Sequence, residues 1–184
     1  QNQAWDRLSS LKSNIPQAMI FLGPSGVGKR KTARALFQSL NCLTQSETKL
    51  DGFSLFASPE KQITEAPCGE CSSCIKIFQN NHADYFEIGP KDTFGSTEII
   101  SVDDFAAIKK TLYFKPMDSP YRFIVIDNAH KMNAVAANSL LKTLEEPPTG
   151  YHFLLLAANA EAVIATIKSR CLVVTLSAAQ EDYA

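Results

Sequence analysis

The stretch Gly23-Pro-Ser-Gly-Val-Gly-Lys-Arg30 decides what kind of fold this sequence encodes. Its spacing is that of a phosphate-binding loop (P-loop), which needs glycine, four residues, glycine, lysine, and then serine or threonine. Gly23, Gly28 and Lys29 fit this pattern, whereas Arg30 replaces the final hydroxyl residue. In a working P-loop that hydroxyl helps to bind Mg²⁺. The sequence therefore predicts a phosphate cradle whose metal-binding half is incomplete.

The flanking sequence places this loop between a strand and a helix. Residues 18–22 form a short apolar run that stops at Gly23, as expected for a buried strand that enters a glycine-rich turn. Residues 29–40 have helical spacing, with Ala33, Leu36, Phe37 and Leu40 on one side. A chance match in a glycine-rich turn is the alternative, and the strand–loop–helix context weighs against it.

Apolar runs and helical segments alternate along most of the remaining chain. We expect strands at 85–88, 122–126, 153–157 and 172–176, and helices at 101–113, 133–145 and 162–168. Strands that are apolar on both faces and alternate with helices predict an α/β fold with a five-stranded parallel sheet flanked by helices. The P-loop would then lie beyond the carboxyl ends of the strands, where such sheets bind ligands.

The candidate nucleotide site consists of loop backbone and two charged side chains. Backbone N–H groups of residues 23–29, including those of Ser25 and Gly26, can cradle phosphates at the start of the helix, and Lys29 can reach the outer phosphates. Asp127 follows the third strand, where an aspartate would help to hold the metal; a turn or capping role is the alternative. Asn128 has no carboxylate and cannot act as a base. Whether ATP or ADP still binds with magnesium stays open.

Residues 41–80 interrupt the alternation and hold four of the five cysteines. Cys68, Cys71 and Cys74 have a spacing at which three thiolates can close around one ion. Cys42 is the best fourth ligand, with His82 in reserve. We expect a structural zinc, because four thiolates leave no open position for catalysis. The alternatives are disulfides, which are disfavoured in the cytoplasm, and an iron–sulfur cluster.

Composition and charge exclude several classes of protein. The formal charge of −1 gives no basic excess that would point to nucleic acid. No apolar run approaches the roughly 20 residues of a membrane helix, and residues 1–13 lack the apolar core of a signal peptide. We therefore expect a cytoplasmic protein. Cys171 lies apart from the other cysteines, and we expect it to be a plain core residue. A zinc-containing nucleic-acid-binding module is a rival, but it would need a basic surface studded with aromatic residues.

Several segments together resemble the clamp-loader subunits of bacterial DNA polymerase III. They are the run 139–148 (SLLKTLEEPP), the Ser-Arg-Cys motif at 169–171, the cysteine cluster and the P-loop. The resemblance covers nearly the whole chain. It implies an AAA+ P-loop NTPase-type domain over residues 1–176, with the zinc module inserted at 41–80. Residues 177–184 would then begin the following lid domain.

The resemblance leaves two kinds of subunit, of which gamma/tau hydrolyses ATP and delta-prime generally does not. Three departures favour delta-prime: Arg30 replaces the hydroxyl, Asn128 replaces an acid, and Ala157 and Ala158 replace threonines that sense the γ-phosphate. Residues 82–86 are also similar to the His-Pro-Asp-Tyr-type segment of delta-prime, although alanine stands where that family has proline. The ATP-hydrolysing gamma/tau subunit remains the alternative.

A delta-prime subunit would give Arg170 to its neighbour's ATP site as an arginine finger, which stabilises charge on the transferred phosphate. It would have no ATPase activity of its own, within a holoenzyme that is a nucleotidyltransferase. The implied partners are gamma/tau and delta subunits in a hetero-oligomeric ring, the sliding clamp and primed DNA, without a membrane. From the residues alone, the alternative for Arg170 is an ion pair with a surface acid. Lys142 and Glu145 lie three positions apart on one helix face, which indicates a local ion pair; contact with the neighbouring subunit or with DNA is their functional alternative.

Overall fold

The computed structural model describes residues 8, 14–45, 67–89 and 99–177. The predicted loops within 44–65 and 91–97, the N-terminal segment 1–13 and the predicted start of a further domain at 177–184 lie almost wholly outside these residues. The domain boundary at 176 therefore stays a prediction. None of the helices in the described part of the chain has the length and apolar character that crossing a bilayer requires.

Five strands form one parallel sheet, as predicted. Their bounds are β1 Ala18–Leu22, β2 Tyr85–Ile88, β3 Arg122–Ile126, β4 Tyr151–Ala157 and β5 Leu172–Thr175. The strand order is β2-β3-β4-β1-β5, and every neighbouring pair is parallel. β4 begins two residues earlier than predicted, because Tyr151 already pairs with Arg122 of β3. β1 lies inside the sheet, so the loop that follows it is flanked by β4 and β5.

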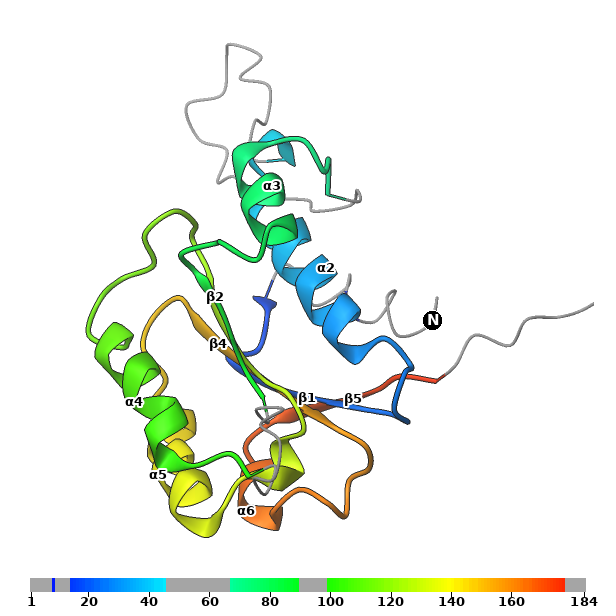
Figure 1. Cartoon of the computed structure of the whole chain (residues 1–184), viewed down its shortest axis with the longest axis vertical. Coiled ribbons are helices and arrows are strands. Elements are labelled where there is room, and N and C mark those ends of the chain that lie inside the picture. The colour runs from blue at the N-terminus through cyan, green and yellow to red at the C-terminus, as the bar shows by residue number, and fades with distance from the viewer. Residues whose placement is uncertain (1–7, 9–13, 46–66, 90–98, 178–184) are drawn as a thin grey trace, which may run out of the picture.

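Helices cover both faces of this sheet (Figure 1). α2 (Lys29–Asn41) and α3 (Ser72–Phe78) cover one face, and α4 (Val102–Thr111), α5 (Ala134–Glu145) and α6 (Ala165–Lys168) cover the other. Two short 3-10 turns, η2 (Leu43–Gln45) and η3 (Ala129–Lys131), complete the described elements. α6 is shorter than the predicted helix 162–168. The Asn159 side chain accepts a hydrogen bond from the Ala162 N–H at 2.8 Å, which holds a turn before α6.

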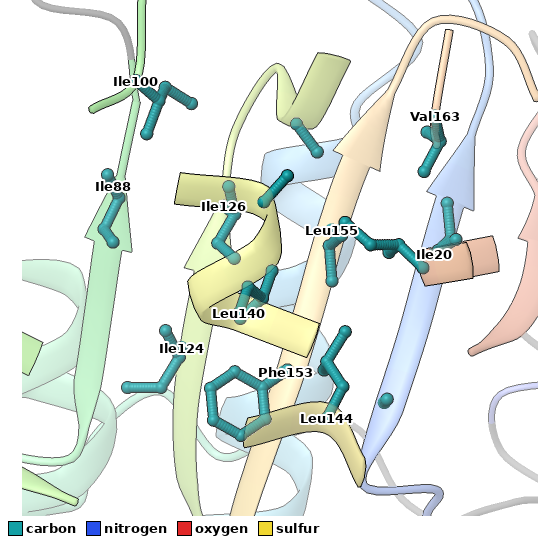
Figure 2. Close-up of a cluster of buried hydrophobic side chains, with 14 of the residues drawn as sticks. Ile20, Ile88, Ile100, Ile124, Ile126, Leu140, Leu144, Phe153, Leu155 and Val163 are labelled. Carbon is teal, nitrogen blue, oxygen red and sulfur yellow. The ribbon is translucent and has the colours of Figure 1, made fainter. Parts of the chain in front are cut away.

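Apolar side chains pack against both faces of the sheet. Figure 2 shows Ile20, Ile124 and Leu155 of three neighbouring strands and Leu140 of α5, all in one buried cluster. The next residue of β1, Phe21, points to the opposite face and belongs to the cluster that includes the α2 residues. Burying such a side chain contributes about 1.5–3 kcal/mol. The carboxyl edge of the sheet is therefore a well-anchored base for the P-loop.

The helices differ in how they begin, and the difference bears on the site. At α4 the Asp104 carboxylate accepts a hydrogen bond from the Ser101 N–H at 2.8 Å, as part of a capping box. At α5 the Asn133 side chain accepts from the Ala136 N–H at 2.8 Å. α2 begins at Lys29, and its N-cap residue, Gly28, has no side chain that could form a capping hydrogen bond. The first N–H groups of a helix lack intrahelical partners, so those of α2 can bind an anion.

Candidate functional site

The P-loop borders a cavity of about 290 Å³ between β1, α2 and the end of β3. The lining residues are Ser25, Gly26, Gly28, Lys29, Arg30, Lys31, Asp127 and Asn128. The structure thus brings the predicted nucleotide-binding residues together, apart from Gly23 at the base of the loop. Arg170 is not among the residues that line this cavity.

Glycine is required at three points of the loop. A Cβ atom on Gly23 would lie 2.4 Å from the carbonyl oxygen of Leu176, so a side chain cannot fit there. Gly26 and Gly28 have φ angles of 81° and 95°, in the left-handed region that other residues rarely adopt. The loop backbone therefore has the close approach and the turns for which the sequence pattern selects glycine.

Lys29 lies against the loop that precedes it. Its Nζ donates hydrogen bonds to the carbonyl oxygens of Gly23 at 2.6 Å and Pro24 at 2.9 Å. Burial lowers the pKa of Lys29, and the nearby Asp127 carboxylate opposes that shift. To bind a phosphate, the ammonium would exchange these two carbonyl oxygens for phosphate oxygens.

The residue that departs from the P-loop pattern makes the most informative contacts of the site. Arg30 Nε forms an ion pair with Glu87 Oε1 and lies 4.0 Å from Asp127 Oδ2. Arg34, one turn further along α2, pairs with the other Glu87 oxygen at 3.1 Å. Glu87 is not among the residues that the sequence predicted for the site, although it is the only acid in an otherwise apolar and aromatic strand.

These contacts do not fit a magnesium site. Mg²⁺ requires near-octahedral oxygen ligands and is usually held by one or two carboxylates together with phosphates. Here the carboxylates of Glu87 and Asp127 face a guanidinium instead, and Arg30 offers no oxygen. Thr32, the nearest hydroxyl residue on α2, donates its hydroxyl to the carbonyl oxygen of Gly28 at 3.1 Å. Arg30 thus places a positively charged side chain beside the two carboxylates.

The other two departures lie at neighbouring strand ends. Asn128 has a φ of 51° and caps η3, and its backbone N–H donates to Asp127 Oδ1 at 2.9 Å. Asp127 is therefore partly engaged in a turn, the alternative role that the sequence left open. Ala157 is fully buried at the end of β4, and its carbonyl oxygen accepts a hydrogen bond from the Gly23 N–H at 3.2 Å.

The four cysteines 42, 68, 71 and 74 form a cluster with all Sγ atoms within 4.8 Å of one another. Cys42 caps the end of α2, whereas Cys71 caps the start of α3 and Cys74 lies within it. The Cys68 N–H approaches Cys42 Sγ at 3.5 Å, and the Cys71 N–H approaches Cys68 Sγ at 3.3 Å. A hydrogen bond from the Thr44 side chain, with backbone N–H groups, lowers the pKa of Cys68 to about 6. Four converging thiol groups suit a closed tetrahedral ion such as Zn²⁺.

His82, the reserve ligand, lies outside this cluster. Its Nε2 contacts Ser73 Oγ at 3.2 Å and Ser119 Oγ at 3.4 Å, and its ring packs edge-on against Phe37. Cys171 is partly buried and packs against the apolar core, as expected, and burial raises the pKa of its thiol to about 11. Cys42 thus completes the cluster.

Arg170 follows α6 and is partly exposed. Its Nη2 forms an ion pair with Glu145 Oε1 at 2.8 Å, and its Nη1 donates to the carbonyl oxygen of Thr166 at 3.0 Å. The structure thus shows the ion pair of Arg170 with a surface acid that the sequence left as an alternative, and Glu145 pairs with Arg170 rather than with Lys142 on its own helix. The contact holds Arg170 where the carboxyl-terminal ends of α5 and α6 lie close together.

A buried ion pair close to the cysteine module was missed by the sequence analysis. Asp84 and Arg122 are 0% and 2% exposed, with Arg122 Nη2 at 2.6 Å from Asp84 Oδ1. The Asp84 carboxylate also accepts hydrogen bonds from the backbone N–H groups of residues 117–119. Arg122 Nη1 donates to the hydroxyl of Tyr151 at 2.8 Å. Complete burial and full pairing indicate a structural role.

The sheet order, the P-loop after β1 and the helices on both faces define an AAA+-type domain. Solved structures show the same fold. A DNA polymerase III gamma subunit-related protein from Thermotoga maritima matches 96% of this chain and 47% of its own, with a TM-score of 0.63 and 22% identity. The RuvB Holliday junction branch migration motor of that organism matches 96% of this chain and 45% of its own, with a TM-score of 0.55 and 15% identity.

The sequence model of the family described as "DNA polymerase III, delta subunit" matches residues 1–180, so the chain belongs to this family. The DNA polymerase III subunit tau/gamma of Haemophilus influenzae is 34% identical over 174 residues, which are 94% of this chain and 22% of that protein. The gamma subunit of Buchnera aphidicola subsp. Baizongia pistaciae is 33% identical over 164 residues, 89% of this chain and 38% of that protein. The chain thus spans less than half the length of these relatives. The predicted relationship to the clamp-loader subunits is confirmed.

Proposed function

We propose that this chain is the AAA+ domain of a delta-prime-type subunit of the DNA polymerase III clamp loader. It helps a ring of gamma/tau and delta subunits to place the sliding clamp on primed DNA. Its own site does not hydrolyse ATP, and Arg170 acts on the ATP bound by a neighbouring subunit. The observation that carries this proposal is the guanidinium of Arg30 against Glu87 and Asp127.

That arrangement removes what phosphoryl transfer needs most. The metal ion neutralises charge that develops on the β- and γ-phosphate oxygens and helps to align them. Arg30 pairs with the carboxylates that face this position, and Asn128 cannot orient water as a base. Nucleotide binding can survive such changes, because the loop backbone and Lys29 are intact, but hydrolysis depends on the missing groups.

Arg170 has the properties of a residue that acts in trans. Its side chain is 37% exposed, it lies outside the chain's own P-loop cavity, and the Glu145 carboxylate holds its guanidinium. A planar guanidinium forms paired hydrogen bonds with phosphate oxygens. An arginine provided in trans contributes about 10³–10⁵ in rate in other phosphoryl-transfer enzymes.

A gamma/tau-type motor is the second candidate, because the curated relatives at 32–34% identity carry gamma or tau names. This function requires Mg²⁺ to displace Arg30 from the two carboxylates. It predicts ATP hydrolysis that depends on Lys29 of this chain.

Replacing Arg170 tests the proposed function. In a loader assembled from full-length subunits, Arg170→Ala should slow hydrolysis at the neighbouring site by about 10³-fold. Phosphate release is measured in a single turnover with clamp and primed DNA. Its amplitude should fall by the amount that the one neighbouring ATP site contributes. Lys168→Ala, an exposed basic residue of the same helix end, is the matched control. Unchanged phosphate release from the Arg170→Ala loader would overturn the assignment.

A further inference from the structure

We infer that the P-loop of this chain binds the phosphates of a nucleotide without Mg²⁺, with the Arg30 guanidinium in place of the metal ion. The ligand class is a metal-free nucleoside diphosphate or triphosphate. The inference concerns the chain's own site and goes beyond the proposed action of Arg170 on a neighbour.

The side chains around the cavity carry a net positive charge. Four basic side chains and two acidic ones gather at the start of α2 and the adjoining strand ends: Lys29, Arg30, Lys31, Arg34, Glu87 and Asp127. Their net charge is plus two without any ion, the charge that Mg²⁺ alone would bring. A polyphosphate is attracted to such a site, and the attraction is strengthened where water is partly excluded.

Arg30 can contact a ligand while it stays paired. Its Nε makes the contact with Glu87, and a guanidinium carries five N–H donors in a planar fork. The side chain is 58% exposed and lines the cavity together with Lys29 and the loop glycines. Glu87 and Asp127 thus hold the guanidinium at the edge of the cradle. There, phosphate oxygens can accept hydrogen bonds from its remaining N–H groups.

The same contacts oppose the entry of magnesium. The ion would have to displace Arg30 from Glu87 and Asp127, and it would find no P-loop hydroxyl. Mg²⁺ bound to the nucleotide in solution removes two negative charges from the ligand. A site that already carries a net positive charge then loses attraction, so added Mg²⁺ weakens binding. A complete P-loop has the opposite dependence.

Calorimetry on the full-length protein tests this inference, with ADP or pyrophosphate as the probe in EDTA or in excess Mg²⁺. We expect binding of ADP in EDTA and affinity about tenfold weaker in Mg²⁺. Pyrophosphate should also bind more tightly in EDTA than in Mg²⁺ if the phosphates are the groups recognised. Binding that requires Mg²⁺ would overturn the inference, and so would the absence of ADP binding in both buffers. Neither result alters what Arg170→Ala does in the assembled loader, so the two proposals fail separately.

Variants at position 30 make the test specific. Arg30→Gln lowers the net charge by one and should weaken ADP binding in EDTA by about tenfold. Arg30→Thr restores the P-loop pattern and should make binding depend on Mg²⁺. Lys109→Gln, an exposed charge change on α4, is the control that should keep wild-type affinity. Thermal unfolding verifies that each variant is folded. Wild-type affinity of Arg30→Gln in EDTA would contradict the role of Arg30.

Discussion

Arg30 and Arg122 both pair with carboxylates, but their surroundings give the two ion pairs different consequences. Arg122 is 2% exposed and its partner Asp84 is fully buried, whereas the Arg30 side chain is 58% exposed. Breaking a buried pair leaves an uncompensated charge and costs about 3–5 kcal/mol. Exposed pairs contribute roughly 0–1 kcal/mol. Arg122 therefore stabilises the fold, and Arg30 can be replaced without unfolding it.

Arg122→Leu tests this distinction. The substitution leaves the Asp84 carboxylate buried without its cation, so the free energy of unfolding should fall by about 3–5 kcal/mol. Urea denaturation measures the change, and Arg30→Leu is the control that should stay within roughly 1 kcal/mol of wild type. Equal midpoints for Arg122→Leu and the wild-type protein would show that the pair does not support the native state.

The sequence predicted the residues of the P-loop because they are contiguous and follow a fixed spacing. It did not predict Glu87 and Asp84, the acids that form ion pairs with Arg30 and Arg122. Glu87 lies 53 positions from Arg34, and Asp84 lies 38 positions from Arg122. The pairing of β2 with β3 brings Asp84 to Arg122, and the packing of α2 against the sheet brings Arg34 to Glu87 of β2. Loss of the hydroxyl could be predicted, whereas the use of the arginine in its place could not.

The cysteine cluster joins two helices that are distant in sequence. Cys42 caps the end of α2, and Cys74 lies in the seven-residue α3. A helix of this length is marginal without tertiary support. A metal ion bound by both ends would therefore hold α3 against the P-loop helix.

We expect Cys71→Ser to lower zinc content and to loosen α3, because the binding free energy of a structural metal is part of the folding free energy. Zinc per chain is measured by atomic emission, and the opening of α3 by amide hydrogen exchange. Cys171→Ser is the matched control, since Cys171 lies outside the cluster. Full zinc content in the Cys71→Ser protein would show that Cys71 is not a ligand.

Strands were easier to predict than helices. The runs that became β1, β3 and β4 are fully buried, so their apolar sequences show them plainly. α6 has only four residues, and the part of the predicted helix before Ala165 forms a turn in which Asn159 accepts a hydrogen bond from the Ala162 N–H. α3 was not predicted, because residues 41–80 offered a ligand spacing rather than a helical period.

On the scale of the whole molecule, one AAA+-type fold holds two phosphate-directed features. The P-loop cavity lies at the start of α2, and Arg170 lies where α5 and α6 end. The first serves a ligand of this chain, and the second, in the proposed function, serves a ligand of the neighbour. In the proposed function, loss of the metal half of the first site and retention of the arginine give a subunit that assists hydrolysis without performing it.

Two variants compared in the assembled loader distinguish an assisting subunit from a motor. Lys29→Ala disables the chain's own cradle, and Arg170→Ala removes the arginine offered to the neighbour. We expect ATP hydrolysis stimulated by clamp and primed DNA to be unchanged by Lys29→Ala and to lose the contribution of the one neighbouring site with Arg170→Ala. A loader that loses hydrolysis with Lys29→Ala and keeps it with Arg170→Ala would contradict the account and identify the chain as a motor.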